Sequence, residues 1–116
     1  MPGPNAISSA QLARLIGTPG APALIDVRLP ADAQADPHLL PTARSIPHSE
    51  IETLIPALQS RRAVVICARG RKLSEGAAAL LRAGGISAEV LEGGHAAWRA
   101  ADLPLLPATL MPQTAL

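Results

Sequence analysis

The 116 residues of the chain suffice for one domain with a sizeable core and are too few for two. The formal net charge of +1 gives no case for nucleic acid or an acidic membrane surface as a partner. The single cysteine excludes an intramolecular disulfide, the N-terminus lacks the pattern of a signal peptide, and no apolar run approaches the ~18 residues of a membrane span, so we expect a cytoplasmic protein.

The first part of the chain predicts a helix followed by a buried strand. Ser8 or Ser9 can cap a helix over residues 10–16, and Gly17 ends it. Residues 23–27, Ala-Leu-Ile-Asp-Val, form a short apolar run that is typical of a strand buried on both faces.

Charged residues interrupt and close this strand. Asp26 lies inside the apolar run and Arg28 follows it. Because a buried charge must be paired or hydrogen-bonded, we expect Asp26 and Arg28 to brace the backbone nearby.

Residues 29–47 show no sustained period and contain scattered prolines, which predicts a long ordered loop with a very short strand at 45–46.

The second half of the chain predicts alternating helices and strands. Ser49 followed by Glu52 is a capping-box pattern for a short helix, which Pro56 shortens or kinks. Further elements are expected at residues 63–66 (strand), 71–83 (helix), 87–91 (strand) and 95–101 (helix). Trp98, the only aromatic residue, is expected to fill the core from the last helix.

This alternation predicts an α/β domain with a parallel sheet and helices on both faces. We expect the domain to span residues 7–106, after a flexible N-terminus at 1–6. Three prolines deny regular structure to the chain beyond Asp102, and residues 107–116 are expected to be a Pro-rich tail that lies on the surface or is disordered. Ligands of such sheets bind beyond the carboxyl ends of the strands, where Cys67 falls.

The candidate functional site is the turn from strand to helix that begins at Cys67. Arg69, Gly70, Arg71 and Lys72 follow in this turn. A loop that enters a helix directs backbone N–H groups at one spot and suits an anion, so N–H donors and cations there favour the reactive thiolate. A buried, inert cysteine is the competing interpretation, and the residues alone leave both open.

The histidines do not predict a metal site. His38 and His48 lack a metal-ligand spacing, and one cysteine with three histidines in the chain makes a poor zinc site. We therefore expect no metal and no cofactor. His48 and His95 are expected to be peripheral.

Four stretches of the chain carry a recognisable order and spacing. They are Leu24 to Arg28, His38 to Pro47, Val65 to Gly70, and Leu91 to Trp98. Together they resemble the single-domain rhodaneses, which are sulfurtransferases. The resemblance spans about Ile7 to Leu106. It implies a five-stranded parallel sheet flanked by helices and Cys67 as the sulfur-carrying residue.

The resemblance also implies a double displacement. The Cys67 thiolate takes the outer sulfur of a donor, and a nucleophilic acceptor (cyanide, a thiol or a protein) then takes it from the persulfide. We expect the donor to be a small anion such as thiosulfate. The residues expected to form the substrate site are Ala68, Arg69, Gly70, Arg71, Lys72 and Leu73, with structural support from Asp26, Arg28 and Ser74.

Two positions depart from the family pattern. Many rhodaneses have arginine and then serine or threonine where this chain has Lys72 and Leu73. Lys72 keeps the charge but lacks the planar fork that binds an oxyanion through two bonds. A cysteine phosphatase or arsenate reductase would need arginine at Leu73. A non-catalytic module that binds a protein through the apolar segment 103–116 also fits the pattern, and so does a persulfide carrier that receives its sulfur from a protein.

Overall fold

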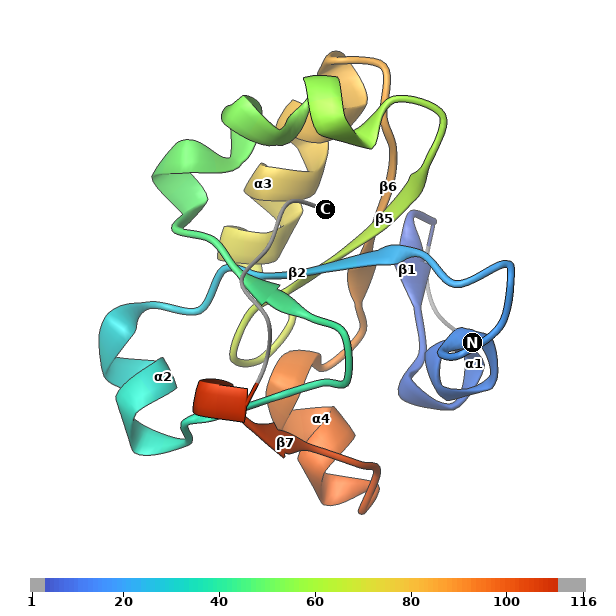
Figure 1. Ribbon diagram of the computed structural model, residues 1–116. Coiled ribbons are helices and arrows are strands. Elements are labelled where there is room, and N and C mark those ends of the chain that lie inside the picture. Colours follow the sequence, from blue (N-terminus) through green and yellow to red (C-terminus); the bar gives the residue numbers. More distant parts are fainter. Residues whose placement is uncertain (1–3, 111–116) are drawn as a thin grey trace.

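The computed structural model describes residues 4–110, and its centre is a five-stranded parallel sheet (Figure 1). The strands are β1 (Ala6–Ile7), β2 (Ala23–Asp26), β4 (Arg44–Ser45), β5 (Arg62–Ile66) and β6 (Ser87–Leu91). They lie in the order β1-β6-β5-β2-β4, and every neighbouring pair is parallel. The predicted fold class is therefore confirmed.

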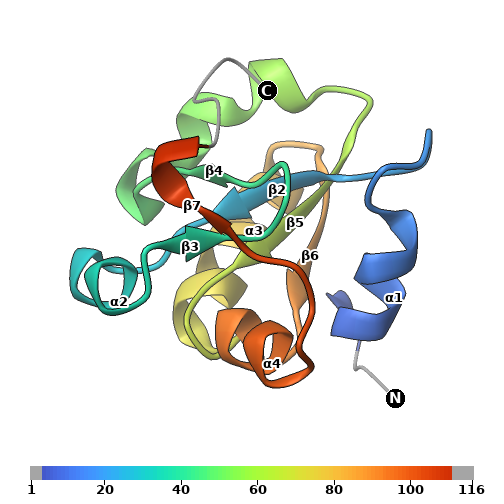
Figure 2. The ribbon, with the colours of Figure 1, turned by 60° about the horizontal axis from the view of Figure 1, so that its bottom comes forward.

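Helices cover both faces of this sheet (Figures 1 and 2). One face carries α3 (Lys72–Ala83) and the 3-10 helices η1 (His48–Leu54) and η2 (Pro56–Leu58), whose buried side chains share a core cluster. The other face carries α1 (Ser9–Leu15) and α4 (Gly94–Ala100), which form the second cluster. No helix within residues 4–110 is long and apolar enough to cross a membrane.

The central strand β5 contributes side chains to both core clusters because successive side chains of a strand point to opposite faces of the sheet. Ala63, Val65 and Cys67 lie in the cluster under α3. Val64 and Ile66 lie in the cluster under α1 and α4. Cys67 therefore continues the alternation onto the α3 face.

Trp98 fills the core from α4, as predicted. Its side chain is 1% exposed, and Nε1 donates a hydrogen bond to the carbonyl oxygen of Pro104 at 2.8 Å. The polar tip of the indole is thus satisfied inside the protein.

The helix starts predicted from the sequence are confirmed in one case and wrong in another. Ser8 caps α1 in a capping box with Gln11, so the helix begins close to where it was expected. The capping box predicted for Ser49 does not form: the segment is 3-10 helix, begins after Pro47 and has no side-chain cap. Pro56 opens a separate turn, η2, because it lacks the N–H that would continue the helix.

The long segment after Arg28 is more regular than its pattern indicates. It contains α2 (Pro30–Ala35) and β3 (His38–Leu39), neither of which was predicted. No residue of α2 is buried, so the helix leaves no apolar period in the sequence. The short strand expected at 45–46 is present as β4, one residue earlier.

Both ends of the described chain join the fold. β7 (Leu106–Pro107) pairs antiparallel with β3, and η3 (Ala108–Leu110) follows, so the expectation of no regular structure is wrong for 106–110. Proline is tolerated in so short an edge strand because no ladder bond depends on its nitrogen. Asn5, expected to be flexible, accepts a hydrogen bond from Val90 N at 2.9 Å through its carbonyl oxygen. The remainder of the expected flexible N-terminus and tail, residues 1–3 and 111–116, lies outside the described residues.

Candidate active site

Cys67 is the first residue after β5, at the carboxyl edge of the sheet. β5 is the middle strand, between β2 and β6. The amide of Val27 donates to the carbonyl oxygen of Ile66 at 2.8 Å, so the pairing of β2 with β5 extends to the residue before the cysteine. A rigid central strand thus sets the position of the thiol.

The Cys67 sulfur lies in a cradle of hydrogen-bond partners. The backbone N–H groups of Gly70 and Arg71 point at Sγ from 3.1 and 3.3 Å. The thiol also donates to Ser74 Oγ at 3.1 Å, and this hydroxyl in turn donates to the carbonyl oxygen of Arg71 at 3.0 Å. Cys67 is 5% exposed and Ser74 is fully buried, so water competes little for these contacts.

Two glycines let the loop pack against the start of α4. Gly70 has a φ of +68°, and a Cβ there would lie 2.6 Å from the carbonyl oxygen of Leu91. Gly94 has a φ of +62°, and a Cβ there would overlap the carbonyl oxygen of Cys67. Neither position has room for a side chain, and both backbone angles favour glycine.

Hydrogen bonds fix the same contact. The amide of His95 donates to the carbonyl oxygen of Cys67 at 2.8 Å, and the amide of Ala96 donates to that of Ala68 at 2.9 Å. The carbonyls of the loop therefore point toward α4. The N–H groups of Gly70 and Arg71 are left for the sulfur.

The cationic side chains of the loop are available to a ligand. Arg69, Arg71 and Lys72 are exposed, and none of the three has a side-chain hydrogen bond or ion pair to another residue between 4 and 110. Leu73 instead packs against the core cluster under α3. The residues predicted from the sequence thus fall into three groups: those that contact the Cys67 sulfur, the exposed cations, and the apolar Leu73, which packs against the core cluster.

Asp26 and Arg28 form a buried pair beside the loop. Arg28 Nε donates to both carboxylate oxygens of Asp26, at 3.1 and 2.9 Å. Burial raises the pKa of Asp26, and the Arg28 charge opposes that rise. The guanidinium also donates to the carbonyl oxygens of Asp36 and His38, so the pair holds the segment between α2 and β3.

His95, expected to be peripheral, is 4% exposed and belongs to this framework. Its Nε2 lies 2.8 Å from the carbonyl oxygen of His38, and its Nδ1 lies 3.7 Å from a carboxylate oxygen of Asp36. Burial lowers the pKa of His95. The only sequence signal was its place directly after Gly93 and Gly94, at the end of a strand.

Asp36 connects three side chains at this end of the sheet. Arg99 donates to both of its carboxylate oxygens, and His38 Nδ1 lies 2.9 Å from Oδ1. The hydrogen bond from Arg99 is the main cause of the lowered pKa of Asp36. Within residues 4–110, no group of three or more histidine, cysteine, aspartate or glutamate side chains could hold a metal ion.

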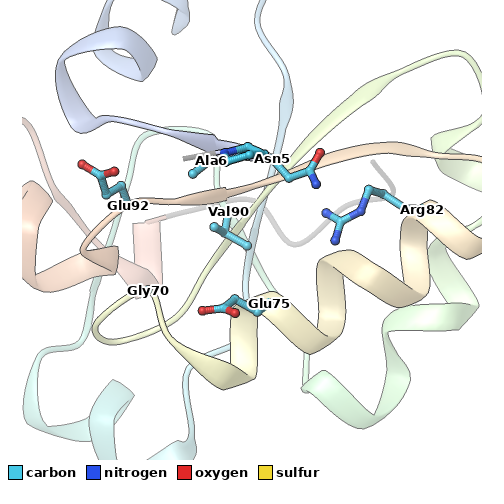
Figure 3. Close-up of a pocket in the computed structure, with 8 residues that line it drawn as sticks. Asn5, Ala6, Gly70, Glu75, Arg82, Val90 and Glu92 are labelled. Atoms are coloured by element: carbon cyan, nitrogen blue, oxygen red, sulfur yellow. The ribbon is translucent and has the colours of Figure 1, made fainter. Parts of the chain in front are cut away.

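Among the hollows lined by residues 4–110, two border the loop. One, of about 220 Å³, is lined by Arg28, Asp32, Asp36, Ala68, Arg69, His95, Ala96 and Arg99. The other, of about 380 Å³, touches the loop only at Gly70. Figure 3 shows Glu75 and Arg82 extending from α3 at this second hollow, with Glu92 at the end of β6. Arg82 also donates to the carbonyl oxygen of Ala88 at 3.0 Å.

Comparison with known proteins agrees with this fold. A family model described as a rhodanese-like domain matches residues 8–101. A rhodanese-related protein from Thermoplasma volcanium is similar over 88% of this chain and 97% of its own, with 27% identity and a TM-score of 0.74. No curated protein gives a significant match.

Two further structures broaden the comparison. A thiosulfate sulfurtransferase from Pseudomonas aeruginosa is 26% identical over 97% of this chain, with a TM-score of 0.77, but the match spans only 22% of that enzyme. A protein of unknown function from Rhodopseudomonas palustris, described as a possible tyrosine phosphatase, is 25% identical, with a TM-score of 0.75. That match covers 87% of this chain and 83% of the other.

Proposed function

The chain belongs to the rhodanese-like domain family, and from this premise we propose that it is a sulfurtransferase that carries a sulfane sulfur on Cys67. The observation that carries the proposal is the convergence of the Gly70 and Arg71 amides on Sγ, 3.1 and 3.3 Å away. Such donors stabilise a sulfur that bears negative charge as a thiolate and as a persulfide. The Ser74 hydroxyl can rotate to donate to the charged sulfur as well.

The proposed reaction has two displacement steps. The Cys67 thiolate attacks the outer sulfur of thiosulfate, the S–S bond of the donor breaks, and sulfite leaves with the bonding electron pair. An acceptor nucleophile then attacks the outer sulfur of the persulfide, and the Cys67 thiolate leaves with the electron pair of the broken bond. The cradle is in place before either step, so little reorganisation opposes the reaction.

The exposed cations support an anionic donor. Arg69, Arg71 and Lys72 lie two, four and five residues after Cys67 and have no side-chain partner within the described part of the chain. We assign these three side chains to the attraction and orientation of the donor dianion. Cyanide, a thiol or a protein thiol is the acceptor, and the cytoplasm is the proposed location.

A cysteine phosphatase is the main competing function, because its cradle is built from the same kind of loop. Clamping a phosphate in such an enzyme requires a guanidinium at the sixth position after the cysteine. Leu73 occupies that position, is partly buried and packs against the core cluster under α3. The sulfurtransferase proposal is therefore the better supported.

The test is to incubate the protein with thiosulfate, measure its intact mass and then add cyanide. We expect the mass of one sulfur atom to be gained, and cyanide to remove it as thiocyanate. Cys67→Ser should gain nothing. Failure of thiosulfate and mercaptopyruvate to load Cys67 would overturn the small-donor enzyme and favour a protein-fed carrier or a binding module, while hydrolysis of an aryl phosphate would favour the phosphatase.

A further inference from the structure

The 220 Å³ hollow lies where the Cys67 loop meets two helices. Figure 1 shows α2 and α4 at the same end of the sheet as this loop. Ala68 and Arg69, the two residues after Cys67, line the hollow on the loop side, and Asp32 lines it on the α2 side. The hollow therefore adjoins the loop that begins at Cys67, although Cys67 itself does not line it.

Most of the charged groups around this hollow are already paired. Arg28 is occupied by Asp26 and two backbone carbonyls. Asp36 binds Arg99 through both carboxylate oxygens. Burial lowers the pKa of His95, which favours its neutral form. These contacts fix the side chains that line the hollow and neutralise their charges.

Two opposite charges remain. The side chains of Asp32 and Arg69 have neither a hydrogen bond nor an ion pair to any residue that the structure describes. They do not bind each other, although they line the same hollow. An unpaired carboxylate and an unpaired guanidinium around one small hollow match a ligand that carries an ammonium group and a carboxylate.

We infer that this hollow binds a small zwitterionic aminothiol, of the α-amino acid type, as the acceptor of the sulfur. Asp32 receives its ammonium group and Arg69 its carboxylate. The inference rests on the proposed function and names the acceptor class for the second step. Because the donor leaves before the acceptor binds, Arg69 can serve the two in turn.

The transfer balances without a further reagent. The acceptor thiol gives its proton to solvent, and its sulfur attacks the outer sulfur of the Cys67 persulfide. A new S–S bond forms on the acceptor as the persulfide bond breaks. Cys67 leaves as a thiolate, held by the N–H groups of Gly70 and Arg71.

The first experiment tests binding without any sulfur chemistry. L-serine, the hydroxyl analogue of cysteine, is titrated into the Cys67→Ser protein while backbone amide NMR shifts are recorded. We expect saturable shifts at Asp32, Ala68 and Arg69, and affinity about tenfold weaker in Asp32→Asn or Arg69→Gln made in the same background. Glu52→Gln and Arg61→Gln change exposed charges outside the hollow and should bind serine like the parent.

The second experiment measures transfer from the loaded persulfide to cysteine and to 3-mercaptopropionate, which lacks the ammonium group. Each transfer rate is divided by the concentration of acceptor thiolate before the two acceptors are compared. We expect cysteine to react faster, and the ratio of the two rate constants to fall about tenfold in Asp32→Asn but not in Glu52→Gln.

The two experiments separate the two proposals. If the protein takes no sulfur from any donor but binds serine through Asp32, the proposed sulfurtransferase function is overturned and the zwitterion site is supported. A protein that loads sulfur but shows no serine shift, or the same cysteine preference in Asp32→Asn, overturns the acceptor site and leaves the sulfurtransferase standing.

Discussion

The carbonyl oxygen of Cys67 accepts a hydrogen bond from the amide of His95 at 2.8 Å. This bond joins the loop after β5 to the first turn of α4, and it forms because Gly94 brings the two backbones close together. The shape of the sulfur cradle therefore depends on a helix that begins 27 residues later in the chain than the cysteine (94 minus 67).

Gly94→Ala should disrupt both the cradle and the fold. The added Cβ overlaps the carbonyl oxygen of Cys67 and the amide of Gly70, and the φ of +62° disfavours alanine. We expect a loss of about 3 kcal/mol in the free energy of unfolding and loss of sulfur loading. Urea unfolding and intact mass after thiosulfate treatment measure the two effects.

Gly76→Ala is the matched control. Gly76 lies within α3, and a Cβ there would meet nothing within 4 Å. Alanine should therefore stabilise the protein by about 0.5–1 kcal/mol and leave loading intact. Equal behaviour of the two variants would contradict the packing role of Gly94.

Ser74→Ala should slow sulfur loading while the fold persists. The substitution removes the one side-chain partner that Sγ has among residues 4–110 but keeps the Gly70 and Arg71 amides. One lost hydrogen bond to a charged sulfur corresponds to a rate lower by about tenfold. The measurement is the rate of persulfide formation under excess thiosulfate. A rate equal to that of the unchanged protein would show that the amides alone stabilise the sulfur.

Sequence reasoning predicted the parts of the candidate site that depend on local pattern. The apolar run before Cys67 predicts the strand, and the glycine and cations after it predict the anion-binding loop. These signals come from adjacent residues, so they can be read without the fold.

The framework around the site could not be found in this way. Arg99 binds Asp36 across 63 residues, and His95 reaches the carbonyl oxygen of His38 across 57. Each partner alone resembles an ordinary surface residue or a peripheral histidine. The helix α2 was missed for a related reason, since it buries no residue and so has no apolar stripe.

Lys72→Arg should improve the use of thiosulfate. Lys72 is exposed at the start of α3 and has no side-chain partner within residues 4–110. A guanidinium offers a planar pair of donors where the ammonium offers a point charge, so we expect kcat/KM to rise about threefold. Lys72→Met should lower it, and Arg61→Lys, away from the loop, should not change it. Unchanged kcat/KM in both Lys72 variants would remove this residue from the donor site.

His95→Gln should make the stability of the protein less dependent on pH. Burial lowers the pKa of folded His95 below its ordinary value of 6.5, against the opposing effects of the His38 carbonyl and the Asp36 and Asp26 carboxylates. The unfolded chain therefore binds this proton more readily. The contribution of neutral His95 to stability is fully present above pH 6.5 and is lost as the pH falls through the lower folded pKa.

Urea unfolding between pH 8 and pH 5 measures this difference. The stability of the unchanged protein should fall more steeply toward pH 5 than that of His95→Gln, whose amide can still donate to the His38 carbonyl but does not titrate. Asp26 and Asp36 interact electrostatically with His95, so the difference between the two proteins reports the proton binding of this coupled group rather than of the imidazole alone. His48→Gln, at an exposed position, should follow the unchanged protein. Parallel curves for the unchanged protein and His95→Gln would mean that folding does not disfavour the charged imidazole, because only a pKa that differs between the folded and unfolded states changes the slope.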